Sequence, residues 1–245
     1  GMAPAPAQSL SQTPQHLQIA AHRGYSGIAP ENTLAAFQAA VQYNADAIEF
    51  DIHMTRDGVP VIMHDDTVDR TTNGKGKVKD KSLAELKKLN AGHKQQIPTL
   101  QETLQAAQGR ILYSEIKGDC TPVDIEKIVR TIVENGYEDR DIMLAFNYQN
   151  LLSTRRYSKH MTLGFLTADR DTFQQALNMA YQDGNAVILA NATLLLKNPH
   201  LITQARQKGI DIGAWTVNSL DDARQLQRLG VKRIITDKLV VQLRQ

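Results

Sequence analysis

Short apolar runs rich in β-formers alternate with amphipathic segments along nearly the whole chain. From residue 17 onward, eight of these runs have the length of strands, and most are followed by apolar residues spaced three and four apart, which is typical of a helix packed on one face. Glycine ends several helical segments, as in Asn135-Gly136 and Lys208-Gly209. The predicted strands are 18–22, 47–53, 111–117, 141–146, 162–166, 186–190, 211–217 and 233–236, and the predicted helices include 33–43, 123–135, 171–181, 199–208 and 220–229.

This alternation predicts a parallel sheet, and eight strands are the number that closes a TIM (β/α)8 barrel. The structural alternative is an open, doubly wound sheet. That fold would place a glycine-rich phosphate turn and a helix directly after the first strand, but no helical pattern follows His22-Arg23-Gly24-Tyr25-Ser26-Gly27. We therefore expect an α/β fold of the TIM barrel class.

One segment breaks the alternation. After the second predicted strand, the turn Arg56-Asp57-Gly58 and the run 59–64 indicate a hairpin, and the polar stretch 65–99 contains one short helical pattern near 83–89. A long loop with its own elements is usually functional. We expect a small inserted subdomain, about residues 65–99, over the mouth of the barrel.

The ends of the chain complete the predicted domain organisation. Residues 1–16 are rich in Ala, Pro, Gln and Ser, and are predicted to form a disordered leader. Residues 17–245 are predicted to form a single (β/α)8 domain. The leader lacks the basic and apolar regions of a signal peptide, which favours a cytoplasmic location, although secretion or a periplasmic location stays open if a signal was removed.

Composition narrows the possible functions. The 245 residues carry a formal net charge of +2, which gives no basic footprint for nucleic acid. The one cysteine, Cys120, excludes an internal disulfide and a thiolate metal cluster. No stretch approaches the ~18–20 apolar residues of a spanning helix, so no stable membrane insertion is expected. A monomer or a homodimer that acts on a small molecule fits this composition.

Reactive side chains gather where the predicted strands end, which is where barrel enzymes bind their substrates. Glu49, Asp51 and His53 alternate on the second strand and therefore share one face. Each residue alone also has a structural interpretation, as an ion pair, a hydrogen-bonded histidine or a core tryptophan. Unrelated structural residues would scatter over both ends of the barrel, so their common end favours a site. The others at this end are His22, Arg23, His64, Glu115, Lys117 and Trp215.

The residue types point to metal-assisted chemistry at phosphorus. Glu49, Asp51 and Glu115 form an all-oxygen set suited to one divalent metal ion, Mg²⁺ or Ca²⁺. With that ion and two cationic side chains, the set keeps one net positive charge, which a phosphodiester monoanion neutralises. Two histidines, His22 and His64, can act as acid and base. An enolase-like or aldolase-like barrel is the alternative, with Lys117 as a base or a Schiff-base lysine.

Several motifs, taken in order and spacing, resemble those of the glycerophosphodiester phosphodiesterase family. The resemblance covers about residues 19 to 237. The chain departs from the family pattern at Ala145-Phe146, where Ser-Phe is frequent, and at Lys232-Arg233, where Asp-Gly is usual. The matching motifs are Ala21-His22-Arg23-Gly24, Ala29-Pro30-Glu31-Asn32-Thr33, residues 49–65, Ile97-Pro98-Thr99-Leu100, Ser114-Glu115-Ile116-Lys117, Trp215-Thr216-Val217-Asn218 and Ile235-Thr236-Asp237.

The resemblance implies a catalytic TIM barrel with an insertion after the second strand. It implies metal-dependent hydrolysis of glycerophosphodiesters to sn-glycerol 3-phosphate and an alcohol through a cyclic phosphate. In that interpretation the three carboxylates hold the metal, and His22 and His64 are acid and base. Arg23 and Lys117 hold the phosphate, Glu31 orients metal or substrate at the edge, and Trp215 and Phe146 contact the substrate.

Two other functions stay open at this stage. A non-catalytic protein that binds phosphodiesters or lipid headgroups would use the same barrel, but would be expected to have lost a histidine or a carboxylate. A phospholipase that acts on intact lipid would be expected to have an apolar rim or a basic membrane face.

Overall fold

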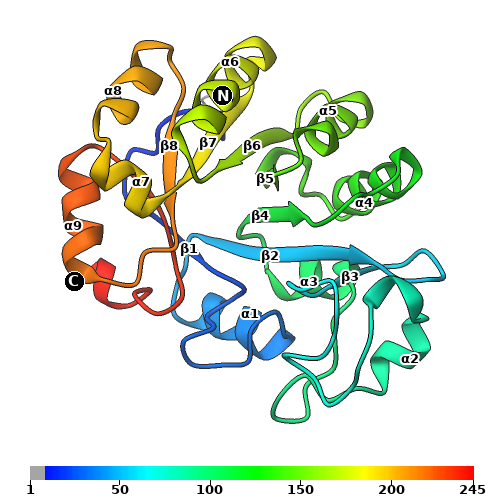
Figure 1. The fold of residues 1–245 in the computed structure, drawn as a ribbon. Helices are drawn as coiled ribbons and strands as arrows, with labels where there is room; N and C mark the ends of the chain where they lie inside the picture. The colour runs from blue at the N-terminus through cyan, green and yellow to red at the C-terminus, as the bar shows by residue number, and fades with distance from the viewer. Residues whose placement is uncertain (1–8) are drawn as a thin grey trace, which may run out of the picture.

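The computed structural model describes residues 9–245, in which eight parallel strands close into a ring (Figure 1). The strand order is β1-β9-β8-β7-β6-β5-β4-β2, and a β1–β2 pairing completes the circle. The predicted TIM barrel class is confirmed, and each of the eight predicted strands is present. The ring consists of β1 (Gln18–Ala21), β2 (Ala47–Met54), β4 (Ile111–Ile116), β5 (Asp141–Ala145), β6 (Thr162–Thr167), β7 (Ala186–Asn191), β8 (Ile212–Trp215) and β9 (Arg233–Thr236).

Helices lie outside this ring, and most begin with a side-chain cap. Thr33, Thr121 and Ser219 each accept a hydrogen bond from a backbone N–H of the first turn, which satisfies a donor that the helix leaves unpaired. The outer helices are α1 (Leu34–Gln42), α3 (Leu100–Ala106), α4 (Pro122–Glu134), α5 (Tyr148–Tyr157), α6 (Arg170–Asp183), α7 (Ala192–Lys197), α8 (His200–Gln207) and α9 (Leu220–Arg228).

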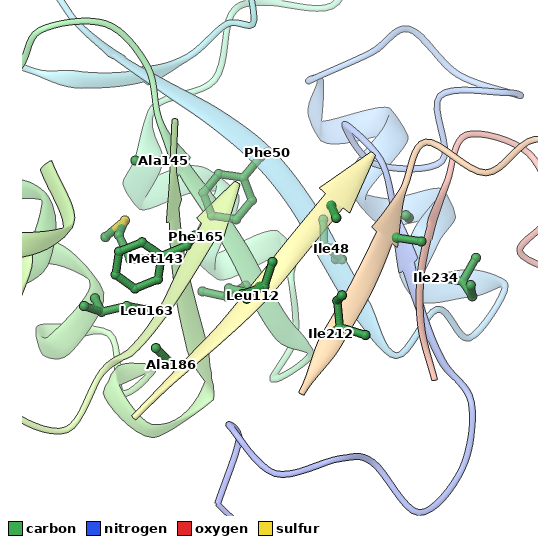
Figure 2. Close-up of a cluster of buried hydrophobic side chains, with 14 of the residues drawn as sticks. Ile48, Phe50, Leu112, Met143, Ala145, Leu163, Phe165, Ala186, Ile212 and Ile234 are labelled. Carbon is green, nitrogen blue, oxygen red and sulfur yellow. The ribbon is translucent and has the colours of Figure 1, made fainter. Parts of the chain in front are cut away.

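Alternation along each strand divides the core into two layers. On β2, Ile48 and Phe50 belong to the large apolar cluster that also contains helix residues such as Phe37 and Ile128. Figure 2 shows members of this cluster on neighbouring strands, among them Leu112 of β4. A second apolar cluster is formed by the alternate strand positions, which face the inside of the ring: Ala20, Ala47, Tyr113, Ile142, Leu144, Leu166, Val187, Leu189 and Ile235. The polar residues Glu49, Asp51 and Glu115 continue these inward rows toward the strand ends.

The inserted segment has a small core of its own. The short strand β3 (Pro60–Ile62) pairs antiparallel with β2 outside the ring, as the hairpin pattern predicts. The helix α2 (Leu83–Lys87) lies where one short helix is expected, and a single 3-10 turn, Val78–Asp80, precedes it. Buried apolar residues join these pieces: Val61, Met63, Val68, Val78, Leu86, Ala91 and Ile97.

The prediction of a disordered leader is wrong for residues 9–16. The guanidinium of Arg233 donates hydrogen bonds to the carbonyl oxygens of Leu10 (2.6 Å) and Gln12 (2.8 Å), and Thr13 donates to Asp211 (2.8 Å). A buried cation at the start of β9 therefore binds this segment to the barrel. The rest of the predicted leader, residues 1–8, lies outside the described residues. Within residues 9–245, no helix combines the length and apolarity needed to span a bilayer.

Candidate active site

Three buried carboxylates converge at the carboxyl end of the barrel. In the β2–β4 register Asp51 lies opposite Glu115, and Glu49 lies two residues before Asp51 on the same face. One oxygen of each side chain lies within 4.8 Å of one oxygen of the other two. Among the described residues, Glu49 Oε1 and Asp51 Oδ1 are buried without a hydrogen-bond partner. Unpartnered oxygens of a hard donor set fit a divalent cation, which a buried acidic triad of this kind could hold.

Burial and mutual charge repulsion shift the pKa values of the triad. Burial and the charges of Asp51 and Glu115 raise the pKa of Glu49 well above its usual value. Burial and the Asp51 charge raise the pKa of Glu115 to about 7, although Lys117 opposes the shift. Burial would also raise the pKa of Asp51, but Lys117 and a hydrogen bond from Asn32 (3.0 Å) lower it. The cluster is therefore short of positive charge, which a bound cation would supply.

Each candidate histidine is held by a carboxylate of its own. The Nδ1 of His22 lies 2.7 Å from Asp237 Oδ1, and the Nδ1 of His64 lies 2.8 Å from Asp65 Oδ1. Burial alone would raise the pKa of Asp237, but the His22 contact and other hydrogen bonds lower it to about 2. Ionised carboxylates only accept hydrogen bonds, so Nδ1 donates and Nε2 is left available for proton transfer.

The loop after β1 places Arg23 over the carboxylates. Arg23 has left-handed backbone (φ 59°), a conformation that non-glycine residues adopt mainly where the surroundings require it. Its backbone N–H donates to Glu49 Oε2 (2.8 Å), and its side-chain Nη1 donates to Glu31 Oε2 (3.1 Å). At the end of β4, Lys117 Nζ lies 2.9 Å from Glu115 Oε2. Two cations therefore flank the triad from different elements.

These groups line one pocket of about 110 Å³. Its apolar wall includes Trp215 and Phe146, whose rings meet edge to face at 5.7 Å, and Phe146 is 49% exposed. Of the predicted site residues, Asp51 lies just below the lining and Glu31 lines an adjoining hollow beside Arg23. The other eight line the pocket itself: His22, Arg23, Glu49, His64, Glu115, Lys117, Phe146 and Trp215.

Reasoning from the sequence missed the carboxylates that hold the two histidines, and it missed Arg70, whose side chain binds Asp65 and Glu31. Asp65 and Asp237 were visible only as parts of motifs, and Arg70 carried no signal at all. His53 lies on the same strand as the triad, but its Nε2 bonds the carbonyl oxygen of His64 (3.1 Å), which is a structural role. Asp65 could have been identified from the sequence, because it is an acidic residue directly after His64.

Known proteins share this fold and sequence along nearly the whole chain. The profile of the Glycerophosphoryl diester phosphodiesterase family matches residues 22–241. A glycerophosphodiester phosphodiesterase of Caldanaerobacter subterraneus subsp. tengcongensis is 36% identical over 89% of this chain and 93% of its own length. The enzyme of that name from Bacillus altitudinis is 31% identical, over 90% and 94%.

A solved structure agrees with both relatives. An Oleispira antarctica phosphodiesterase, determined in complex with the product sn-glycerol-3-phosphate, superposes with a TM-score of 0.81 at 29% identity. The match covers 93% of this chain and 96% of that one. The profile spans residues 22–241, a range that includes both histidines and the carboxylate triad, and the two relatives align with about nine-tenths of the chain, so this chain belongs to the glycerophosphoryl diester phosphodiesterase family.

Proposed function

We propose that the protein hydrolyses glycerophosphodiesters to sn-glycerol 3-phosphate and an alcohol, with the help of one divalent metal ion. The observation that carries the proposal is the convergence of His22, His64 and the carboxylate triad in one pocket. The product named for the Oleispira structure supports the substrate class. The family membership supports the reaction.

The proposed metal would be Mg²⁺ or Ca²⁺, held by Glu49, Asp51 and Glu115. When bound, it would polarise a phosphoryl oxygen as a Lewis acid. Lys117 and Arg23 would balance the remaining phosphate charge, because both lie beside the triad at the pocket wall. Glu31 would orient Arg23 through their hydrogen bond. Phe146 and Trp215 would cover an apolar part of the substrate.

The two histidines would move the protons. In the first step the glycerol 2-hydroxyl attacks phosphorus and one histidine takes its proton. The bond from phosphorus to the alcohol breaks as the other histidine protonates the departing oxygen. A cyclic phosphate results, and water then opens it with the histidine roles reversed. Asp237 and Asp65 favour this exchange because each stabilises an imidazolium at its own histidine.

The test is a coupled assay for glycerol 3-phosphate over a panel of headgroups. We expect turnover that is lost with chelator and restored by Mg²⁺ or Ca²⁺. We expect His22→Ala and His64→Ala each to lower kcat by about 10²–10⁴-fold, the usual range for removing a general acid or base. His160→Ala, an exposed histidine away from the pocket, is the control.

Two outcomes would contradict the proposal. Wild-type turnover by either pocket variant would exclude the acid–base assignment. Binding of glycerophosphocholine without release of glycerol 3-phosphate under any divalent metal would favour the non-catalytic alternative.

A further inference from the structure

Arg70, from the inserted segment, binds two carboxylates at once, those of Glu31 and Asp65. Its Nη1 and Nη2 donate to Glu31 Oε1 (2.7 Å) and Oε2 (3.0 Å). Its Nε and Nη2 donate to Asp65 Oδ2 (2.9 Å) and Oδ1 (3.1 Å). A planar guanidinium that meets two carboxylates in this forked way fixes both in orientation.

Each of these carboxylates holds a group of the candidate active site. Asp65 Oδ1 accepts the hydrogen bond of His64 Nδ1, and Glu31 Oε2 accepts that of Arg23 Nη1. Arg70 is therefore connected to His64, a proposed acid–base group, through Asp65. It is connected to Arg23, a proposed phosphate ligand, through Glu31. The two branches reach the pocket from different elements, the loop after β1 and the segment after β3.

We propose that Arg70 is a positioning residue that sets the orientation of the His64 imidazole and the Arg23 guanidinium together. The inference rests on the proposed function, since it assigns a role to the neighbours of His64 and Arg23. Without Arg70, Glu31 and Asp65 would be two carboxylates without their shared counter-charge, free to turn away from their partners. The inserted subdomain would then contribute to catalysis through Arg70 as well as through Asp65.

Arg70 is partly exposed, but its ion pairs form a network. Its side chain is 48% exposed, and a single exposed ion pair contributes only about 0–1 kcal/mol. Arg70, however, makes two forked ion pairs, which together form a network. Such networks contribute more than single exposed ion pairs do. Hydrogen bonds from Arg70 also hold the pKa of Asp65 well below its usual range, so Asp65 stays ionised opposite His64.

The simpler alternative is that Arg70 only fastens the inserted segment to the barrel. Arg56 provides a matched control for that role. It lies in the turn between β2 and β3 and binds Glu85 (2.7 Å) and the Asp80 carbonyl oxygen (2.8 Å) of the inserted segment, contacts that do not involve either histidine. Arg56→Ala removes a comparable surface tether of the insertion and leaves His64 and Arg23 untouched.

The experiment compares Arg70→Ala, Arg70→Lys and Arg56→Ala in the same assay, with thermal unfolding of each. We expect Arg70→Ala to lose about 10–100-fold in activity, the usual cost of removing a group that orients a site residue. The loss should divide between a lower kcat, through His64, and a higher KM, through Arg23. Arg70→Lys keeps the charge but not the fork, and should recover little.

Chemical rescue separates positioning from fastening. Methylguanidinium should restore part of the Arg70→Ala activity, whereas methylammonium should not. Kinetics of Arg70→Ala equal to those of Arg56→Ala would overturn the inference, and so would an activity loss that neither cation rescues and that follows the loss of folded protein. Activity retained by His64→Ala would instead contradict the proposed function.

Discussion

Asp141 shows what happens to a carboxylate buried in this barrel without cations nearby. It begins β5, is fully buried, and its Oδ1 accepts a hydrogen bond from the Ser114 hydroxyl, while its Oδ2 has no partner among the described residues. Burial raises the pKa of Asp141 to about 8, and the Ser114 bond opposes the shift only in part. The carboxylates at the mouth have Lys117 and Arg23 beside them, but no cation of residues 9–245 is among the causes that shift the pKa of Asp141.

This difference predicts a pH-dependent stability. The folded pKa of Asp141 lies above its unfolded value of about 3.9, so its favourable contribution is complete below about pH 4 and is lost as the pH rises toward 8. We expect Asp141→Asn to gain stability relative to wild type across that window, by at most ~1.4 kcal/mol per pH unit. Urea unfolding at several pH values measures the difference.

The control for this prediction is Asp139→Asn, which removes an exposed carboxylate two residues away. Its difference from wild type should stay flat over the same range. If Asp141→Asn behaved in the same way, Asp141 would be ionised at low cost in the folded protein.

At the residue scale, the sequence predicted which side chains face the mouth but not what holds them. Strand alternation is local, so spacing alone places Glu49 and Asp51 on one face of β2, and the β2–β4 register then brings Glu115 beside them. The partner of His22 is Asp237, 215 positions away, and that contact depends on closure of the whole ring. The forked contacts of Arg70 likewise depend on how the insertion folds back.

At the scale of elements, the turn between β1 and α1 depends on Gly24. Its backbone is left-handed (φ +75°), and a Cβ there would lie 2.7 Å from the backbone carbon of Ala36 in α1. This close approach lets Tyr25 N–H donate to the Ala36 carbonyl oxygen (2.9 Å). The strand and the helix are thereby held together directly beside His22 and Arg23.

We expect Gly24→Ala to destabilise the protein by more than the ~1 kcal/mol that left-handed backbone alone costs alanine, and to lower kcat as Arg23 shifts. Gly109→Ala is the matched control, because its φ of +78° is similar and nothing lies within 4 Å of its added Cβ. Thermal unfolding and the glycerol 3-phosphate assay report both effects. Equal costs for the two variants would show that the contact with α1 is unimportant.

Elements were predictable where their hydrophobic pattern was clean. The helix α4 buries Ile125, Ile128 and Ile132 on one face, and its pattern was recognised. The helix α5 is not among the helices named from the sequence, because polar Asn150 and Thr154 share its buried face and obscure the period.

The helix α7 begins directly at the end of β7, so strand and helix share one apolar run in the sequence. Asn191 and Thr193 interrupt this run, which predicts a core strand followed by the start of a helix, and α7 begins there.

At the scale of the whole molecule, the two ends of the barrel have separate roles, one in catalysis and one in stability. The candidate catalytic groups lie at the mouth, and a buried polar network around Arg233 lies at the opposite end. That guanidinium binds Asp211 (2.6 Å), Gln18 (3.2 Å) and the carbonyl oxygens of Leu10 and Gln12. A hollow of about 970 Å³ also lies at this end, away from His22, His64 and the triad.

Removal of residues 1–13 should therefore reduce stability without changing catalysis. The truncation deprives Arg233 of two charge-assisted hydrogen bonds, each worth about 1.5–3 kcal/mol, and we expect the free energy of unfolding to fall by about 3–6 kcal/mol. Removal of residues 1–8 alone keeps Leu10 and Gln12 and serves as the control. Denaturant unfolding and kcat are measured on both. A parallel fall in kcat would contradict the separation of roles.

The anchoring of residues 10–13 has a practical consequence. Arg244, near the other end of the chain, binds the Asn44 carbonyl oxygen and Asp46 (both 2.7 Å), just ahead of β2 and so at the same end as Arg233. Both described ends of the chain thus leave from the side opposite the mouth. Attachment to a solid support or a fusion partner through either end would present the pocket outward, so the tethered enzyme would keep free exchange of substrate with solution.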